Sequence, residues 1–167
     1  MFVLGIDPGL SRCGYGGVVG RAGRAAEVVA AGVITTPAAD PVPSRLAALA
    51  GELRGLIAEL RPDVVVVERV LFQTNVRTAM ATGQASGIAL LAAAEAGCSV
   101  HQYSPNEVKI AITGYGAATK DQMQRMIEAQ LHVPVTREVP DVADALALAL
   151  THLACAPLAA AVERTRA

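Results

Sequence analysis

The chain has 167 residues, of which 53% are hydrophobic, 17% are charged and 3% are aromatic, and its formal net charge is −1. This balance excludes a disordered or fibrous chain, and the length predicts one domain with a sizeable core. The near-neutral charge does not by itself indicate a nucleic-acid-binding protein. We expect a domain over residues 1–156, followed by a C-terminal tail over residues 157–167.

The sequence also predicts where the protein works. It opens with MFVLGIDPG, which lacks the basic segment of a signal peptide, and its longest apolar tract, residues 145–162, is interrupted by Thr151, His152 and Pro157. The three cysteines form no CxxC pair, and the three histidines show no HxH or HExxH spacing. These patterns disfavour disulfides and zinc sites. We therefore expect a cytoplasmic protein with no membrane partner.

The first part of the chain predicts an antiparallel sheet. Phe2–Ile6 is an apolar run that stops at an Asp-Pro-Gly turn, and Tyr15–Val19 and Val28–Thr35 are two further strand candidates. Glycine-containing turns join them, so a three-stranded meander is expected. Asp40–Pro43, which contains two prolines, is interpreted as a loop.

Helices and strands then alternate. Leucines between Leu46 and Leu60 recur at steps of three and four, which predicts an amphipathic helix that ends at Pro62. Val64–Val67 predicts a central strand covered on both faces, because every residue is apolar and β-branched. We further expect a helix over residues 75–96, a strand over residues 98–103, helices after capping boxes at 104–107 and 119–122, and a final helix near residue 140. The prediction is an α/β fold with a mixed five-stranded sheet, an antiparallel meander plus parallel strands, flanked by helices.

Four acidic residues occupy positions that suit a metal site. Asp7 follows the first strand and Glu68 follows the valine strand, and strand carboxyl ends are where ligands bind in open α/β sheets. Asp141 and Asp144 lie three apart at the start of the final helix and share one face. Four carboxylates would suit Mg²⁺ or Mn²⁺, which prefer oxygen ligands, and a pair of such ions is a known arrangement for phosphodiester cleavage.

Each acid also has an ordinary structural explanation. Asp7 suits a turn before Pro-Gly, and Glu68 suits a solvated strand end. Asp141 and Asp144 occupy a first helical turn, where acids interact favourably with the helix dipole. Spacing alone therefore indicates only a candidate divalent-metal site.

Motifs along nearly the whole chain resemble the RuvC family of Holliday junction resolvases. The opening GIDPG at residues 5–9, with GYG at 14–16, resembles the start of that family, and Glu68 matches its second acid. GQASGIA at 83–89 resembles its central helix, and ADALA at 143–147 resembles its C-terminal signature. GIDPG alone is a weak signal, whereas the combination is specific.

The resemblance implies an RNase H-like fold and a homodimer that nicks two opposing strands of a four-way DNA junction in homologous recombination and DNA repair. Asp7, Glu68, Asp141 and Asp144 match the family's catalytic and metal-binding acids. The implied cofactor is Mg²⁺, for which Mn²⁺ substitutes, with two ions per active site. Attack of a metal-activated water on phosphorus would leave 5′-phosphate and 3′-hydroxyl ends. Branch-migration proteins of the RuvA and RuvB type are the implied partners.

Basic side chains are the first candidate DNA contacts. By similarity, Lys109 and Lys120 match family positions that face DNA, and Lys120 begins a capped helix whose free N–H groups favour phosphate. Arg69, Arg77 and Arg125 are weaker candidates, because salt bridges would explain them as well.

One position departs from the family pattern. The family has a junction-wedging Phe three residues after the second acid, where this chain has Leu71 followed by Phe72. Either residue is a candidate DNA contact, and Phe72 suits base stacking or core packing equally.

Gly83, Gly87 and Ile88 on the predicted second helix offer a surface for close packing. A C2 dimer would use it to supply two active sites related by the approximate symmetry of the junction. Packing within the monomer would explain the same residues, and the sequence leaves both interpretations open.

Three other functions compete with the resolvase. Sugar-kinase and chaperone-type ATPases also begin with GIDxG, but 167 residues leave no room for their second lobe. An RNase H-like nuclease that acts on RNA and a non-catalytic junction-binding protein are closer rivals. Four acids favour a nuclease, because a pure binding protein gains nothing from negative charge near phosphate.

Overall fold

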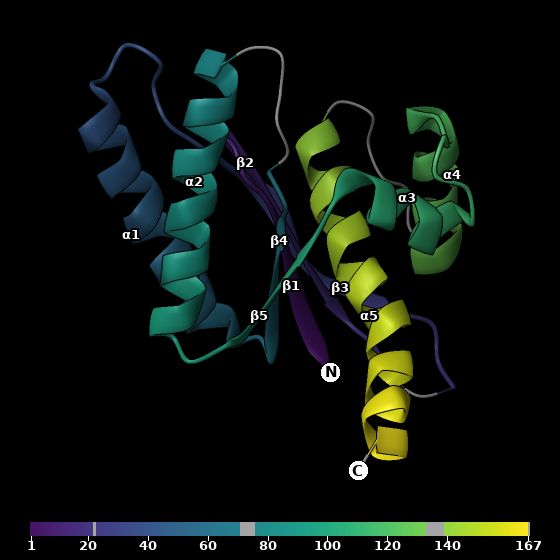
Figure 1. The fold of residues 1–167 in the computed structure, drawn as a ribbon. Coiled ribbons are helices and arrows are strands. Elements are labelled where there is room, and N and C mark those ends of the chain that lie inside the picture. Colours follow the sequence, from purple (N-terminus) through teal and green to yellow (C-terminus); the bar gives the residue numbers. More distant parts are fainter. Residues whose placement is uncertain (22, 71–75, 133–138, 167) are drawn as a thin grey trace.

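The structure is a computed structural model that describes residues 1–21, 23–70, 76–132 and 139–166, without the side chains of Arg77 and of residues 157–166. In the described residues, strands come first, helices and strands then alternate, and helices come last (Figure 1). In order they are β1 (Phe2–Asp7), β2 (Arg12–Val19), β3 (Glu27–Thr35), α1 (Val42–Leu60), β4 (Val64–Glu68), α2 (Val76–Glu95), β5 (Ser99–Tyr103), α3 (Pro105–Thr113), α4 (Lys120–Leu131) and α5 (Pro140–Arg166).

The sheet is mixed, as predicted, with the strand order β3-β2-β1-β4-β5. The first three strands form the expected antiparallel meander, whereas β4 runs parallel to both β1 and β5. Ile6 of β1 lies opposite Val67 of β4. Asp7 and Glu68, one residue further on, therefore leave the sheet at the same edge.

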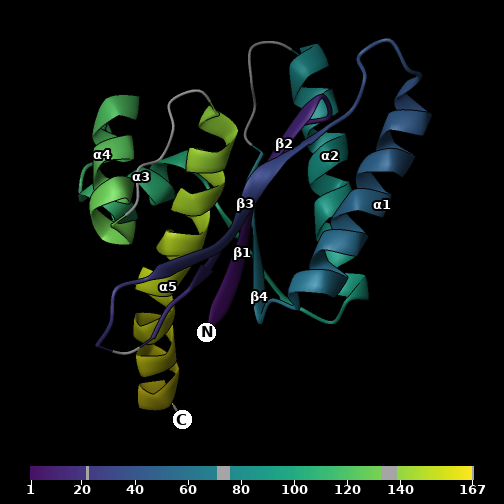
Figure 2. The same cartoon turned by 180° about the vertical axis from the view of Figure 1, so that it is seen from behind.

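Helices cover both faces of the sheet, which makes three layers. Helices α1 and α2 lie on one face, and α5 crosses the other face with α3 and α4 beside it (Figures 1 and 2). Side chains of β4 alternate between the two cores, with Val64 and Val66 toward α5 and Val65 and Val67 toward α1 and α2. All four valines are at most 6% exposed, so the prediction of a central strand covered on both faces is confirmed.

Glycines in β1 and β2 let α5 lie directly on the sheet backbone. A Cβ at Gly5 would collide with the main-chain carbonyl of Ala145, and one at Gly14 would collide with the main chain of Asp141. Ala145 is fully buried at this contact. Small residues on both sides therefore set how closely the helix that carries Asp141 and Asp144 approaches β1 and β2.

Some predicted boundaries differ from the structure. The interpretation of Asp40–Pro43 as a loop is wrong for its second half, because Val42 and Pro43 begin α1, and proline is well accommodated in a first helical turn. Strand β2 begins at Arg12, three residues before Tyr15, where it pairs with Thr35 of β3. Helix α5 continues to Arg166, through the stretch expected to be a tail.

Within the described residues, no helix is long and apolar enough to cross a membrane.

Candidate active site

Asp7 and Glu68 meet at the carboxyl edge of β1 and β4. Their carboxyl groups share a hydrogen bond, and the pKa of Asp7 is raised to about 8 by burial first and then by the charges of Glu68 and Asp144. Burial also raises the pKa of Glu68, while its hydrogen bond with Asp7 opposes that rise. Two carboxyl groups this close hold a proton between them unless a cation replaces it.

Helix α5 brings the other two predicted acids to the same place. Burial raises the pKa of Asp144, Lys120 lowers it, and Asp141 raises it again. The charges of both α5 acids also act on Asp7. The structure thus brings together the four acids predicted from the sequence, from two strand ends and one helix N-terminus.

Arg12 is a site residue that the sequence analysis missed. Its Nε and Nη2 both donate to Oδ2 of Asp141, at 2.9 and 2.7 Å. The Arg12 side chain is 51% exposed and that of Asp141 is 21% exposed. In the sequence, Arg12 is recognisable only as a basic residue shortly before the GYG motif. Nothing around it indicates that it pairs with a residue 129 positions further along the chain.

The four acids suit a divalent metal ion by their chemistry. They offer only carboxylate oxygens, the ligands that Mg²⁺ and Mn²⁺ prefer, and their mutual repulsion would be relieved by a cation. In the described part of the chain, no three His, Cys, Asp or Glu side chains lie close enough to hold an ion as they stand. Metal binding would therefore require side-chain movement, and Asp141 is already held by Arg12.

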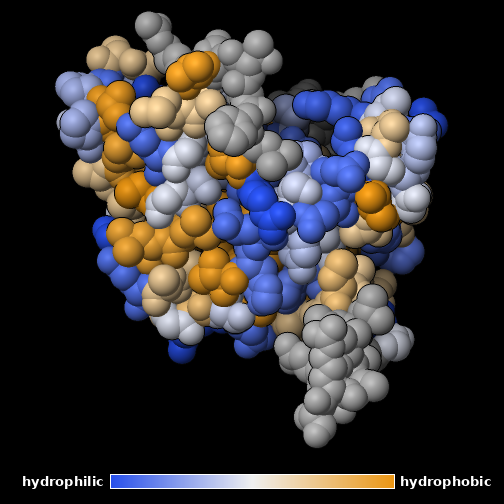
Figure 3. All heavy atoms as spheres, in the orientation of Figure 1, coloured by the Kyte–Doolittle hydropathy of each residue, from blue (hydrophilic) through white to orange (hydrophobic). Residues whose placement is uncertain are grey.

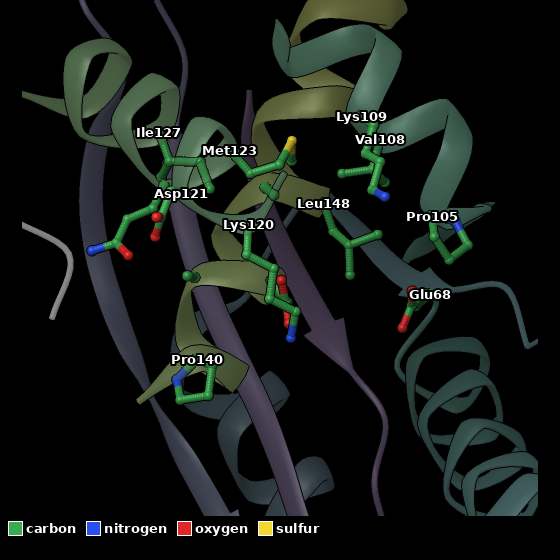
Figure 4. A pocket seen from close by; sticks show the side chains of 14 residues that line it. Glu68, Pro105, Val108, Lys109, Lys120, Asp121, Met123, Ile127, Pro140 and Leu148 are labelled. Carbon is green, nitrogen blue, oxygen red and sulfur yellow. The ribbon is translucent and has the colours of Figure 1, made fainter. Parts of the chain in front are cut away.

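A pocket of about 510 Å³ opens beside the acids, between α3, α4 and α5. Glu68 and Asp144 line it, together with Lys109 and Lys120. Figure 4 shows Lys120 extending into this pocket from the start of α4, with Glu68 at its far edge. The two lysines place positive charge next to the acidic cluster, where a phosphodiester would need it.

The remaining candidate DNA contacts have mixed outcomes. Arg69 forms an ion pair with Glu107 at 3.4 Å and donates a hydrogen bond to the main-chain carbonyl of Gln102 at 3.0 Å. The ion pair agrees with the alternative explanation of Arg69 as a salt-bridge residue. Arg125 is exposed on α4. Leu71 and Phe72 lie outside the described residues, as does the side chain of Arg77.

Helix α2 presents an apolar stripe to the outside. Val76, Met80 and Leu91 are 72%, 61% and 48% exposed, and a Cβ at Gly83 or Gly87 would meet nothing within 4 Å. Figure 3 shows apolar side chains gathered over this helix. Packing of the two glycines within the monomer is thereby excluded for the described residues. Ile88, by contrast, packs against the core and does not belong to the stripe.

Comparison with known proteins places the chain in a family. The family model "Crossover junction endodeoxyribonuclease RuvC" matches residues 3–152. The RuvC of Salinispora arenicola is 50% identical, with 99% of this chain and 97% of that protein aligned. The RuvC of Chloroflexus aggregans is 47% identical, over 94% of this chain and 95% of that protein.

Solved structures agree with the sequence relatives. T. thermophilus RuvC in complex with a Holliday junction substrate superposes with a TM-score of 0.89 at 33% identity, covering 95% of this chain and 96% of that chain. The yeast mitochondrial Holliday junction resolvase Ydc2 has a TM-score of 0.69 at 16% identity, which shows a shared fold. The expected RNase H-like architecture is confirmed by these neighbours.

Proposed function

The chain belongs to the RuvC family of crossover junction endodeoxyribonucleases, and we propose that it resolves four-way DNA junctions by metal-dependent nicking of two opposing strands. Membership makes the protein a phosphodiester-cleaving endonuclease of recombination and repair. The observation that carries the finer proposal is the meeting of Asp7, Glu68, Asp141 and Asp144 beside a lysine-lined pocket.

The four carboxylates are the proposed ligands of two Mg²⁺ ions, with Mn²⁺ as a substitute. Bound there, such ions would activate water and stabilise negative charge on the phosphate oxygens. Asp7 and Glu68 must give up the proton that they share before both can bind a cation. Asp141 can contribute Oδ1, because both of its hydrogen bonds from Arg12 converge on Oδ2.

The lysines position the DNA. Lys120 stands at the N-terminus of α4, which begins with a Thr119 capping box, and its charge acts on both Glu68 and Asp144. An ammonium group there holds a phosphate close to the acids while reducing their repulsion toward it. Lys109, which lines the same pocket from α3, would hold the same strand further along. The proposed products are a 5′-phosphate and a 3′-hydroxyl.

The proposal includes a homodimer that forms through the α2 stripe. A junction needs two matched cuts, and a C2 dimer supplies two active sites. The stripe is apolar and open in the described structure, which suits contact with a second copy. A cytoplasmic location and cooperation with RuvA- and RuvB-type branch-migration proteins follow from the family resemblance alone.

The test is a substrate comparison. A labelled four-way junction, a linear duplex and an RNA–DNA hybrid are incubated with the protein in EDTA, Mg²⁺ or Mn²⁺. We expect paired nicks in the junction only, and only with a metal. Efficient cutting of the hybrid with the junction left intact would overturn the substrate, and absence of cleavage with either metal would favour a binding protein.

A further inference from the structure

A second pocket, of about 400 Å³, is lined in part by α1 and α2, which lie on the opposite face of the sheet from the helices that carry Lys109 and Lys120 (Figure 1). Its walls include residues 9–11, which connect β1 and β2, Arg12 at the start of β2, Arg45 of α1, and Thr78 and Thr82 of α2. Arg12 belongs both to this wall and, through Asp141, to the active site. Arg12 therefore links the wall of this pocket to the acidic cluster.

Arg45 contributes a buried positive charge to the wall of this pocket. Its side chain is buried, yet its two hydrogen bonds go to neutral hydroxyls, from Nε to Thr36 at 2.9 Å and from Nη2 to Ser11 at 2.6 Å. Among the described residues, no carboxylate forms a salt bridge with it. A guanidinium has five N–H donors, and a buried charge without a counter-ion is costly. An anion in the pocket would relieve that cost.

The neighbouring groups indicate which anion fits. Ser11 and Thr82, which both carry a hydroxyl group, line the pocket, and Arg12 uses only two of its N–H donors on Asp141. Two guanidinium groups with hydroxyls suit the non-bridging oxygens of a phosphodiester. A strand whose scissile phosphate lies at the acids would extend from the lysine pocket on one side toward this pocket on the other.

We propose that this pocket binds a backbone phosphate of the strand that is cut, on the side of the scissile phosphate opposite Lys109 and Lys120. Arg12 and Arg45 supply the charge, and Ser11 and Thr82 donate hydrogen bonds. This inference rests on the proposed function. It adds a fixed point that sets the register of the strand across the acids.

The proposed contact between the pocket and one backbone phosphate can be tested with methylphosphonate linkages, which carry no charge. Junctions with one such linkage at each phosphate around the cut are titrated in EDTA with the unsubstituted protein, Arg12→Gln, Thr82→Ala and Arg45→Lys. Arg54→Gln is the matched control, because Arg54 lies on α1, about 13 Å along the helix from Arg45, and pairs with Glu95. Circular dichroism checks that each variant is folded.

We expect one linkage to weaken binding by the unsubstituted protein and by Arg54→Gln about tenfold or more. The same linkage should change the affinity of Arg12→Gln less than about twofold, and the salt dependence of log K should fall by about 0.9, the value for one lost phosphate contact. For Thr82→Ala and Arg45→Lys, the loss of affinity caused by this linkage should lie between that of the unsubstituted protein and that of Arg12→Gln. Equal losses at every linkage in all proteins would overturn the pocket and leave Arg45 as a structural residue. Failure of the unsubstituted protein to prefer the junction over duplex would instead overturn the proposed function.

Discussion

Arg12 of β2 and Asp141 of α5 are joined by two hydrogen bonds that end on a single carboxylate oxygen, at 2.9 and 2.7 Å. The pair connects the start of β2 to the helix that carries two of the four acids. It also places a permanent positive charge on Asp141, whose own charge acts on Asp7 and Asp144. Arg12 therefore neutralises part of the cluster when no cation is bound.

Removing Arg12 should make the protein depend more on metal. Arg12→Gln is expected to lower the melting temperature in EDTA by only about 1–4 °C, because the pair is partly exposed. Its affinity for Mg²⁺ should rise, since Asp141 loses a competing cation. Thermal shift against Mg²⁺ concentration measures both effects without DNA. If Arg12→Gln reached half of its stabilisation at the same Mg²⁺ concentration as Arg54→Gln, Arg12 would not compete with the metal for Asp141.

The raised pKa of Asp7 predicts how stability depends on pH without metal. Its pKa rises from 3.8 to about 8 in the folded protein, so the folded state loses stability relative to the unfolded state as pH increases between those values. Asp7→Asn should remove much of this slope and raise the melting temperature at neutral pH in EDTA. Melting curves from pH 5 to 8.5 check it, with Asp40→Asn as the exposed control. Parallel slopes for Asp7→Asn and the unsubstituted protein would refute the shift.

The contact between β1 and α5 predicts a steric effect on catalysis. Gly5→Ala places a Cβ against the main chain of Ala145, and such overpacking costs about 1–3 kcal/mol. The displaced helix carries Asp141 and Asp144, so cleavage should fall more than junction binding does. Gly51→Ala is the control, because nothing lies within 4 Å of its Cβ and alanine favours a helix. Unfolding in urea measures the loss of stability, and cleavage rates measure the loss of catalysis. Full activity in Gly5→Ala would show that the close contact between β1 and α5 is not needed for cleavage.

The exposed stripe of α2 predicts the dimer interface. Leu91→Asp puts a charge into that apolar surface and should convert a dimer into a monomer while leaving the fold intact. Val29→Asp changes an apolar side chain of similar exposure, 49%, on β3 and should leave the dimer unchanged. Sedimentation equilibrium distinguishes the two states. A dimer that persists in Leu91→Asp would place the interface elsewhere.

Features encoded in short stretches of sequence were predictable. The valine strand followed by Glu68 was recognisable because β-branched residues and a terminal charge occupy consecutive positions. The two capping boxes at Ser104 and Thr119 likewise appear as predicted, with reciprocal hydrogen bonds. The start of α1 was missed because proline is compatible both with a loop and with a first helical turn.

Features that depend on the fold were not predictable from local patterns. Arg12 meets Asp141 because Gly14 lets α5 approach the start of β2 closely. The burial of Arg45 among hydroxyls depends in the same way on Ser11, which lies 34 residues before it in the sequence, and on Thr36, which lies 9 residues before it. The glycines of α2 were recognised as a packing surface, but the structure was needed to show that the monomer leaves them open.

The most direct test of the central claim is cleavage of a four-way junction by Asp144→Asn in Mg²⁺, measured together with junction affinity. The amide keeps the size of the side chain but removes a charged ligand, so we expect cleavage to fall at least about a hundredfold, as when a group that stabilises the transition state is lost, and junction affinity to be maintained or increased. Asp40→Asn should cleave normally. Cleavage by Asp144→Asn at the rate of the unsubstituted protein would contradict the assignment of this acidic cluster as the catalytic centre.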